Sequence, residues 1–595
     1  MAHTHYMGLS GSALRTAIGL VAGLCFVAFG YGQGDIGGLM VMSAFEDEFR
    51  QIDAALSPTL HTANLAGITV AVWNLGCFVG AMITIFVGDV LGRKGSIMFG
   101  LVLMTIGYII QIASFSLGQY IAGRFVAGFG NGFIASTVPA WQAECLKTHR
   151  RGTLLLVSFG SCITAGLAIA YWMDYAFDFV SNQSVAWRTP IALGLIWMIV
   201  PLFILIWMPE SPRYLILTGR ETEAKSVFSA LNELPPDGED IHREFLMVKH
   251  TLLHMSSGGV AQAFKMGEYR YLHRTILAVL LQLMQQFTGV NVFMQYLGSM
   301  FRIQLHYKGS MSLLLASCCA TEFFLASLVA VIGIDRFWGR RALTMFGAAG
   351  MCGCLVALAV LTWAATQETW YAMTAFLFLY CTFFSIGWQG MSWLWAVELI
   401  PLCTRGPANA LATAMNWAAN FTVVMTTPAM FTIIHYRTYI VYAVINAFIV
   451  PTIYFLYPET GYRSLEEVDV LFSEASTEKS PWLAVVKVAH NEPTWFDQGI
   501  GSHSSISDSQ EKDQAKKHVS SGSDEGNWKA HPHDRHPSAA SSESSPRRRD
   551  ESSEGAADAP PDISASPPRK RSVSDHSRNG EKMRPNLSSL GPGAQ

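Results

Sequence analysis

Charged side chains are scarce in this chain of 595 residues, where Lys, Arg, Asp and Glu together supply 14% of the sequence. Soluble domains carry about 25% of such residues, whereas here hydrophobic residues reach 51% and the mean hydropathy is +0.28. This balance excludes an ordinary soluble protein and favours one that lies in a membrane. We therefore expect a lipid bilayer around the chain and no nucleic-acid partner.

Cysteine is present, but its positions do not suggest a framework of disulfides between loops. All ten cysteines lie in or beside apolar runs, as Cys318 and Cys319 do, so we predict no structural disulfide and no metal site. The sequence also lacks a phosphate-binding loop and a nucleophile placed beside a base. We expect no cofactor and no covalent chemistry, so the chain is not predicted to be an enzyme.

Long apolar runs are abundant. A helix of about 20 apolar residues crosses the hydrocarbon core of a bilayer, where lipid cannot satisfy an exposed backbone. The first run is too long and too rich in glycine for a cleaved signal peptide. Twelve runs predict an all-α membrane protein with twelve transmembrane helices; they cover residues 15–40, 64–88, 96–115, 119–145, 152–174, 189–208, 274–300, 310–334, 341–364, 371–397, 406–432 and 438–457.

Lys and Arg are concentrated in alternate segments between these runs. The segments after runs 2, 4, 6 and 8 are basic, whereas residues 46–53, after the first run, are mostly acidic. Basic loops tend to stay in the cytosol. Because the number of spans is even, we expect both termini to be cytosolic.

The two halves of the chain repeat each other. GDVLGRKGS (88–96) and PESPRYL (209–215) in the first half correspond to IDRFWGRRAL (334–343) and PETGYRSLEE (458–467) in the second. This repeat predicts two pseudo-symmetric six-helix bundles with a site between them. The expected parts are a cytosolic N-terminus (1–14), the first bundle (15–208), a partly helical cytosolic linker (209–273), the second bundle (274–457), a cytosolic end motif (458–475) and a cytosolic tail (476–595).

The tail from residue 476 is rich in Ser, Pro, His and charge, as in SSESSPRRRDESSEG. Such a composition cannot bury enough apolar surface to offset the entropy of ordering, so we predict that the tail is disordered. SSPRRR and SPPRKRSVS leave two interpretations open: sites for phosphorylation or for binding cytosolic proteins, and a plain solvated tail.

One long stretch carries a resemblance to a known family. GRFVAGFGNGFIASTVPAWQAECLKTHRRG (123–152) has the spaced glycines Gly128 and Gly132, followed by Glu144 and Arg151. The chain resembles the sugar porter family of the major facilitator superfamily over about residues 15–472, with Trp141 as a departure from its signature. The resemblance implies an alternating-access carrier of a hexose, a pentose or a sugar-like polyol, expected in the plasma membrane.

The resemblance also implies ion pairs that act as latches on the cytosolic side, holding helix ends together in the outward-facing state. An alternative is that these charges only set the orientation in the membrane. The extra residue Trp338 leaves the register of Asp335 open. The latch residues would be Asp89, Arg93, Glu144 and Arg151 in the first half, and Asp335, Arg340, Arg341, Glu398 and Arg405 in the second.

The expected substrate site consists of amides in the apolar runs. In LQLMQQFTGVNVFMQY (281–296), Gln282, Gln285 and Gln286 follow helical spacing, and Asn291 comes next. Amides both donate and accept hydrogen bonds, as the hydroxyls of a polyol do, and polar groups within a membrane tend to face a cavity. The resemblance to the seventh, tenth and eleventh helices of the family adds Trp388, to stack on a sugar ring, and Asn416 and Asn420. Amides that only join neighbouring helices are the alternative.

Two departures weaken an ordinary hexose pocket. The family's fifth helix usually carries a glutamine, where this chain offers only Ser158 or Ser161, with shorter reach. The paired tyrosines of the family's seventh helix read Gln295–Tyr296 here. Glu322 in run 8 has three open roles: contact with the substrate, proton binding, or pairing with a neighbouring helix. A pentose, a polyol or a quinate-like cyclic acid is therefore an alternative substrate.

FGYGQGDIGGL (29–39) bears on proton coupling. Proton symporters of the resembled family have a pattern similar to FGYD in the first helix, and its aspartate pairs with an arginine of the fourth helix. Here the arginine is kept as Arg124, the aspartate position is Gly32, and a carboxylate follows at Asp35, about 4.5 Å further along a helix. Asp35 has three interpretations: a displaced proton site paired with Arg124, a structural ion pair in an uncoupled facilitator, or an unpaired group at a wet helix end.

A carrier-like nutrient sensor that signals through the tail is the rival to the carrier as the function of the whole protein.

Overall fold

The computed structural model describes residues 6–52, 59–146, 156–235, 238–255, 260–333, 339–364, 366–461, 463 and 465–492, all within the unit Met1–Gln510. Every regular element among these residues is a helix. Within these described ranges, ten helical segments are long and apolar enough to cross a membrane. The remaining two predicted spans, 119–145 and 152–174, coincide with α4 and with η2 followed by α6.

The first half supplies six spans. They are α1 (Gly11–Leu39), α3 (Leu60–Ile112, two spans that meet at Gly92), α4 (Leu117–Cys145), η2 (Val157–Cys162) with α6 (Ile163–Phe177), and α7 (Gln183–Leu205). The short α2 (Ser43–Glu48) and η1 (Arg50–Ile52) follow α1. We call the end of the bundles that bears α2 the α2 end.

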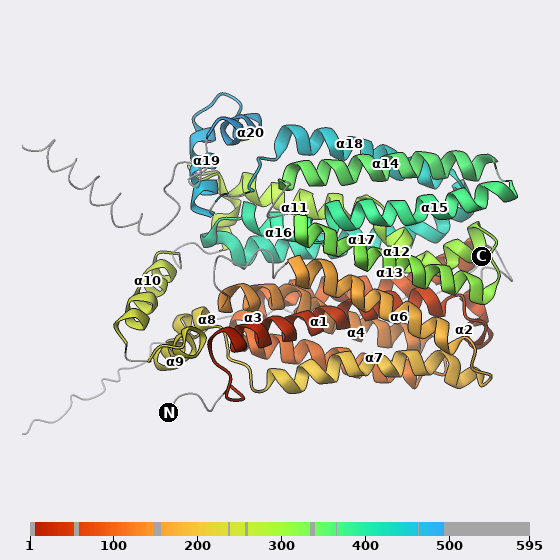
Figure 1. The fold of residues 1–595 in the computed structure, drawn as a ribbon, viewed down its shortest axis with the longest axis horizontal. Helices are drawn as coiled ribbons and strands as arrows, with labels where there is room; N and C mark the ends of the chain where they lie inside the picture. Colours follow the sequence, from red (N-terminus) through yellow and green to blue (C-terminus); the bar gives the residue numbers. More distant parts are fainter. Residues whose placement is uncertain are drawn as a thin grey trace, which may run out of the picture. The chain divides into compact units, whose positions relative to one another are not determined.

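The second half supplies the other six. They are α11 (Tyr271–Phe287) with α12 (Val290–Ser299) and η4 (Met300–Gln304), α13 (Gly309–Gly333), α14 (Arg340–Ala364), α15 (Gln367–Phe384) with η5 (Ser385–Gln389) and α16 (Met391–Leu399), α17 (Arg405–Ile434, after η6, Leu402–Thr404) and α18 (Arg437–Leu456). Figure 1 shows the two sets as neighbouring bundles of roughly parallel helices. The prediction of two six-helix bundles is confirmed.

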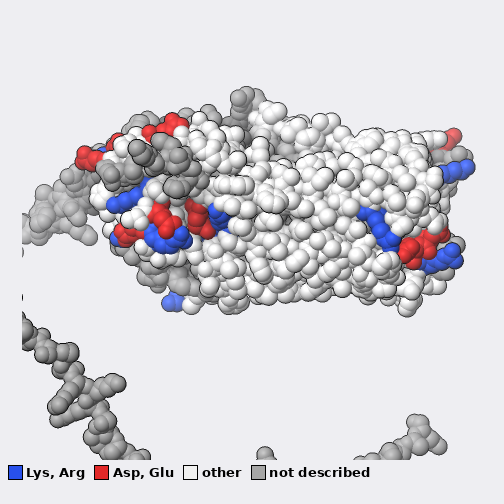
Figure 2. Space-filling view, turned by 90° about the horizontal axis from the view of Figure 1, so that it is seen from below, with Lys and Arg blue, Asp and Glu red and all other residues white. Residues whose placement is uncertain are grey.

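Charged residues on the face shown in Figure 2 gather at the two ends of the helices, and the wide band between them is free of Lys, Arg, Asp and Glu. Large hydrophobic side chains such as Phe86, Ile109, Phe203 and Phe448 are exposed on the bundles. An uncharged band with exposed apolar side chains suits the hydrocarbon core of a bilayer.

Glycines allow the helices of the first bundle to approach closely. A Cβ added at Gly128 of α4 would lie 2.2 Å from the carbonyl oxygen of Trp73 in α3, and one at Gly30 of α1 would lie 1.9 Å from that of Ile163. No larger residue fits at such contacts, because backbone atoms occupy the space. The spaced glycines of the signature therefore serve helix packing.

Several spans are interrupted near the middle of the bundles. Gly289, with φ of 93°, separates α11 from α12, and η2 and η5 are π-helical turns. A further π-helical turn, η4, ends the α11–α12 span at the α2 end. Such interruptions occur at functional sites and in the broken helices of transporters. They place irregular backbone next to the interface between the bundles.

The linker contains α8 (Pro212–Leu217), α9 (Glu221–Asn232), α10 (Glu239–Met255) and η3 (Val260–Phe264). These helices lie at the end of the bundles opposite α2, together with α19 (Leu465–Ser476) and α20 (Pro481–Asn491). We call this the linker end (Figure 1).

The prediction that the tail is disordered from residue 476 is wrong for Pro481–Asn491, which form α20. This helix buries Val485 and Ala489, and Trp482 lies 3.7 Å from His273 between ring centres. Its apolar residues recur at helical spacing, so a short amphipathic helix docks where the composition of the whole tail predicts disorder. Residues 493–595 lie outside the described part of the chain.

Candidate functional site

An internal cavity of about 50 Å³ lies between the two bundles. A cavity of this size holds a few water molecules but no sugar ring, so the bundles must move apart to admit a substrate of that size. Its walls come from α1 and α6 of the first bundle and from α11, α12, α13, α15, η5, α16 and α17 of the second. Seven of the lining residues are amides: Gln33, Gln285, Gln286, Asn291, Gln389, Asn416 and Asn420.

These amides bond to one another across the cavity. Asn291 accepts from Gln33 at 2.9 Å and donates to Gln286, so that one asparagine joins both bundles. Gln286 donates to Asn416 at 3.2 Å, and Asn416 donates to Gln285 at 3.0 Å. Every bond in this network could be exchanged for one to a hydroxyl, because an amide and a hydroxyl each donate and accept.

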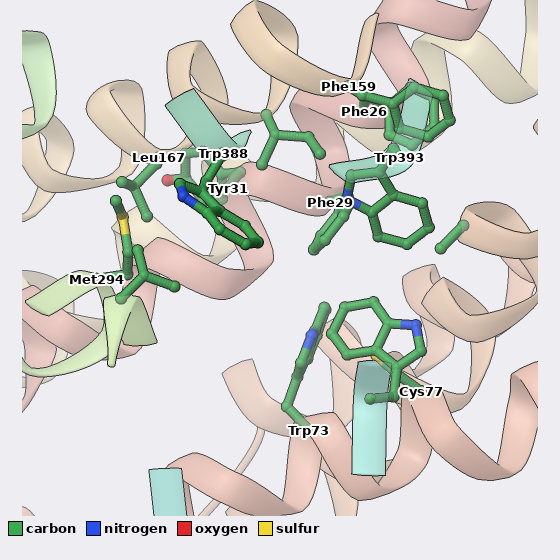
Figure 3. Packing of buried hydrophobic residues seen from close by; sticks show 14 of the residues in the cluster. Phe26, Phe29, Tyr31, Trp73, Cys77, Phe159, Leu167, Met294, Trp388 and Trp393 are labelled. Atoms are coloured by element: carbon green, nitrogen blue, oxygen red, sulfur yellow. The ribbon is translucent and has the colours of Figure 1, made fainter. Parts of the chain in front are cut away.

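Aromatic rings close one side of the cavity and also cross between the bundles. Phe159 of η2 stacks on Trp393 of α16, with ring centres 5.3 Å apart and planes within 3°. Phe26 lies against Phe159 at 4.7 Å, and Phe29 against Trp417 at 5.4 Å. Figure 3 shows Phe26 and Phe159 beside Trp393. Phe29, Trp393 and Trp417 line the cavity, where their faces suit the C–H surface of a sugar.

Two predicted substrate residues lie away from the cavity wall. Trp388 is fully buried, and its indole N–H donates to the carbonyl of Thr344 at 3.1 Å. Gln282 lies behind the cavity wall, where its side-chain oxygen accepts a hydrogen bond from the amide of Asn416 at 2.7 Å. Trp393 therefore occupies the position expected for Trp388. Gln33, Gln389 and Trp417 were missed from the sequence because each is a single polar or aromatic residue without a pattern.

Ser158 and Ser161, the predicted substitutes for the missing glutamine of the fifth span, also lie away from the cavity wall. Ser158 accepts from Gln142 at 3.0 Å, and Ser161 accepts from Ser327 at 3.0 Å. Thr164, one turn beyond Ser161, lines the cavity instead. Among the described residues of this span, the hydroxyl of Thr164 is therefore the one polar side-chain group at the cavity wall, beside the apolar Ile163 and Leu167.

Glu322 of α13 is not among the cavity residues. The hydroxyl of Thr382 in α15 donates to its carboxylate at 2.5 Å. Of its three predicted roles, the geometry favours pairing with a neighbouring helix.

Asp35 and Arg124 form a buried ion pair. Nη1 of Arg124 lies 2.9 Å from Oδ1 of Asp35, and both side chains are closed to solvent. The hydroxyl of Tyr108 donates to Oδ2 of Asp35 at 3.1 Å, and the guanidinium of Arg124 lies 5.2 Å from the ring centre of Trp73. The interpretation of Asp35 as an unpaired group at a wet helix end is therefore wrong.

The space beside Gly32 explains why the carboxylate stands one turn later. A Cβ at Gly32 would lie 2.5 Å from Cη2 of Trp73 and 3.0 Å from the hydroxyl of Tyr108. Trp73 thus fills the volume that an aspartate at position 32 would need. Asp35, three residues on, reaches Arg124 past this ring.

At the linker end of the first bundle, Arg93 lies 3.6 Å from Glu144 across α3 and α4. The hydroxyl of Ser211 also donates to Glu144. Glu210 of the PESPRYL motif accepts from the backbone N–H groups of Arg93 and Lys94, both at 3.1 Å. Burial raises the pKa of Glu210, against the effect of these N–H groups.

The second bundle repeats this arrangement. Arg340 lies 3.2 Å from Glu398, whose carboxylate also accepts from Thr460 at 2.7 Å. Glu459 of PETGYRSLEE accepts from the backbone N–H groups of Arg340 at 2.9 Å and of Arg341 at 3.0 Å. Glu210 and Glu459 were not predicted as site residues, although the repeated Pro-Glu pair of the two motifs marked them.

The other predicted latch residues are less informative. Arg405 donates to the carbonyl of Ile400 at 3.2 Å. The side chain of Asp89 and residues Arg151 and Asp335 lie outside what the structure describes. All the latch contacts seen join helices within one bundle, so their gating role stays a prediction.

An ion pair not predicted from the sequence joins the bundles at the α2 end. Arg302 of η4 lies 2.8 Å from Glu46 of α2 and donates to the carbonyl of Val41 at 2.6 Å. At the other side of the cavity, Leu156 of the first bundle packs with Leu343 and Met391 of the second. The bundles are thus in contact on both sides of the cavity.

Comparison with known proteins shows what the chain is similar to. The sugar transporter STL1 of Saccharomyces cerevisiae is 33% identical over 517 residues, which cover 84% of this chain and 88% of that protein. The high glucose sensor RGT2 of the same yeast is 29% identical over 80% of this chain and 63% of its own length. The proton:xylose symporter XylE of E. coli, bound to 6-bromo-6-deoxy-D-glucose, has the same fold, with a TM-score of 0.67 at 24% identity over 78% of this chain and 99% of that one.

The sequence profile described as "Sugar (and other) transporter" matches residues 18–472, which include both bundles and the linker between them. This match and the identity to STL1 extend over the helices that build the amide cavity and the buried ion pair. The chain belongs to the sugar (and other) transporter family of the major facilitator superfamily, whose members are membrane carriers.

Proposed function

We propose that the protein is an alternating-access carrier that moves a sugar or a sugar-like polyol across the plasma membrane together with protons. In this proposal the linker end and both termini are cytosolic. The observation that carries it is the position of α1, which contributes Gln33 to the cavity and Asp35 to the buried ion pair with Arg124.

The substrate class follows from the cavity wall. Seven amides offer donors and acceptors in many directions, and the wall holds no charged side chain among the described residues. Aromatic faces, Phe29, Trp393 and Trp417, complete it. Such a wall suits a neutral polyhydroxyl compound with one apolar face, and it argues against a quinate-like acid, whose carboxylate would be desolvated without a cation.

Helix geometry links substrate and proton. Phe29 and Gln33 are four residues apart and line the cavity, whereas Asp35, two residues beyond Gln33, is turned by about 200° toward α4. An ion pair in such a dry place depends on both charges, so protonating Asp35 leaves Arg124 without its counter-charge. The pair then weakens, α1 is released from α4, and the cavity face of α1 moves with it.

Transport by the purified full-length protein in liposomes tests the proposal. We expect a radiolabelled hexose, pentose or polyol to accumulate above equilibrium under an inward proton gradient, and a protonophore to abolish the accumulation. Asp35→Asn should remove accumulation. Exchange by the unaltered protein that does not depend on the gradient would show a facilitator instead. A parallel screen of neutral polyols and quinate-like acids identifies the substrate.

A nutrient sensor is the second candidate, favoured by the likeness to RGT2 and by the docking of α19 and α20 on the second bundle. Uptake in a host without sugar carriers separates the two functions. Uptake that survives removal of residues 493–595 favours the carrier. No uptake of any neutral polyol, with signalling that is lost on removing the same residues, favours the sensor.

A further inference from the structure

Two aspartates in the described helices are completely buried, and only one of them has a counter-charge. Asp35 pairs with Arg124, whereas neither carboxyl oxygen of Asp174 in α6 has a hydrogen-bond partner. An ionised carboxylate buried without a partner is far more unfavourable than the neutral acid. Asp174 is therefore held as a protonated carboxyl group in this arrangement.

Asp174 lies against α1, one turn beyond Asp35. A Cβ added at Gly38 would be 2.2 Å from Oδ2 of Asp174, so the carboxyl group touches the backbone of α1 at that point. Gly38 follows Asp35 by three residues, which is about 4.5 Å toward the α2 end of the helix. Asp174 thus stands between the ion pair and the α2 end.

The surroundings of Asp174 hold no positive charge among the described groups that interact with it. The titratable groups that face it are Asp35 and Tyr31 of α1, Tyr120 of α4 and Tyr171 on its own helix. Asp178, one turn further along, accepts from the hydroxyl of Ser310 at 2.6 Å and is only partly buried.

The second bundle shields this part of α6 from solvent. The hydroxyl of Tyr171 donates to the carbonyl of Met294 in α12 at 2.8 Å, and Ser317 of α13 donates to the carbonyl of Tyr171 at 2.9 Å. On the α1 side, a Cβ at Gly37 would lie 3.1 Å from the carbonyl oxygen of Gln295. Moving α12 away at the α2 end would therefore admit water to Asp174 before it reaches Asp35.

We propose that Asp174 is a proton relay, which takes a proton from the α2 side and passes it to Asp35. The O–H bond of the Asp174 carboxyl breaks, the proton moves to the Asp35 carboxylate through water that enters when α12 withdraws, and an O–H bond forms there. The Asp174 carboxylate that remains is unpartnered and regains a proton from the water at the α2 end. The inference rests on the proposed proton coupling, to which it adds the entry route.

A relay changes the rate of proton entry but not the equilibrium that the gradient sets. In liposomes containing the full-length protein, we expect Asp174→Asn to lower the initial rate of gradient-driven uptake about 100-fold relative to substrate counterflow, which needs no net proton movement. The final accumulation should stay that of the unaltered protein. Asp174→Glu should restore part of the rate, and the matched control Asp178→Asn should leave the ratio of rates unchanged.

Each other outcome has a defined meaning. An unchanged ratio in Asp174→Asn overturns the relay, and an equal fall of both rates shows a structural role and overturns it too. A collapse of the final accumulation makes Asp174 the coupling site itself and also contradicts a relay. If the unaltered protein exchanges substrate but never accumulates it, the proposed coupling fails and the relay fails with it; normal accumulation in Asp174→Asn at the normal rate overturns the relay alone.

Discussion

Arg302 and Glu46 tie the two bundles together at the α2 end, with Nη1 of the arginine 2.8 Å from Oε1 of the glutamate. The two residues belong to η4 and α2, which are far apart in the sequence, and Arg302 also donates to the carbonyl of Val41, next to the end of α1. Opening the cavity toward the α2 end has to break this pair.

We therefore expect Arg302→Gln to favour the form that is open at the α2 end. A partly exposed ion pair stabilises by at most about 1 kcal/mol, so the shift in population should be several-fold. Labelling of a cysteine introduced at Val290 in the cavity, by a reagent added from the α2 side, measures it. Arg437→Gln, at the start of α18, is the matched control. Slower labelling in Arg302→Gln would contradict the prediction.

The contact between Gly32 and Trp73 predicts that the carboxylate cannot simply be moved back to position 32. Gly32→Asp should destabilise the protein by about 1–3 kcal/mol, because the new side chain overlaps the indole ring. In a Trp73→Ala background the added cost of Gly32→Asp should be smaller, because the indole ring that it overlaps is gone. The melting temperature in detergent measures both effects, and a stable Gly32→Asp protein would show that Trp73 moves aside freely.

The cavity wall predicts different effects for two tryptophans of the tenth span. Trp393→Ala should raise KM for the transported sugar or polyol more than Trp388→Ala does, because Trp393 lines the cavity. Trp388→Ala should lower the melting temperature more than it changes KM, since Trp388 is packed behind the cavity wall and its removal leaves a void of the kind that costs about 3–5 kcal/mol. Uptake kinetics and melting temperature, measured on both variants, separate the roles. Equal effects on KM would contradict this assignment.

Glu210 and Glu459 make matching contacts at the linker end, so we expect their removal to lower the stability of each bundle in the same way. Each carboxylate accepts from two backbone N–H groups at the start of a helix segment. Glu210→Ala and Glu459→Ala should each lower stability by about 1 kcal/mol, as the loss of a helix cap does. Glu233→Ala, on the surface of the linker, is the control for melting temperature. No change in either variant would show that water replaces the carboxylates.

Much of the architecture is predictable from the sequence, because a bilayer demands long apolar helices and each half repeats the other. The amides Gln285, Gln286, Asn291 and Asn416 meet at the cavity because their spacing places them on helix faces that pack together. Side-chain direction is harder to predict. Trp388 and Trp393 are five residues apart in the tenth span, and the π-helical turn η5, which contains Trp388 and joins α15 to α16, decides which of the two faces the cavity. Asp174 carries no pattern at all, since a single aspartate near a helix end looks like a solvated one.

The docking of α20 decides where the protein can be shortened. Composition suggests a cut near residue 480, but that cut removes Trp482 and bares His273 at the entry to α11, the helix that brings three glutamines to the interface. It also frees Arg463, which donates to the carbonyl of Ala489 at 2.8 Å. A cut after residue 492 spares both contacts, so comparing the two lengths separates the support that α20 gives to the carrier from any signal that the remaining residues send.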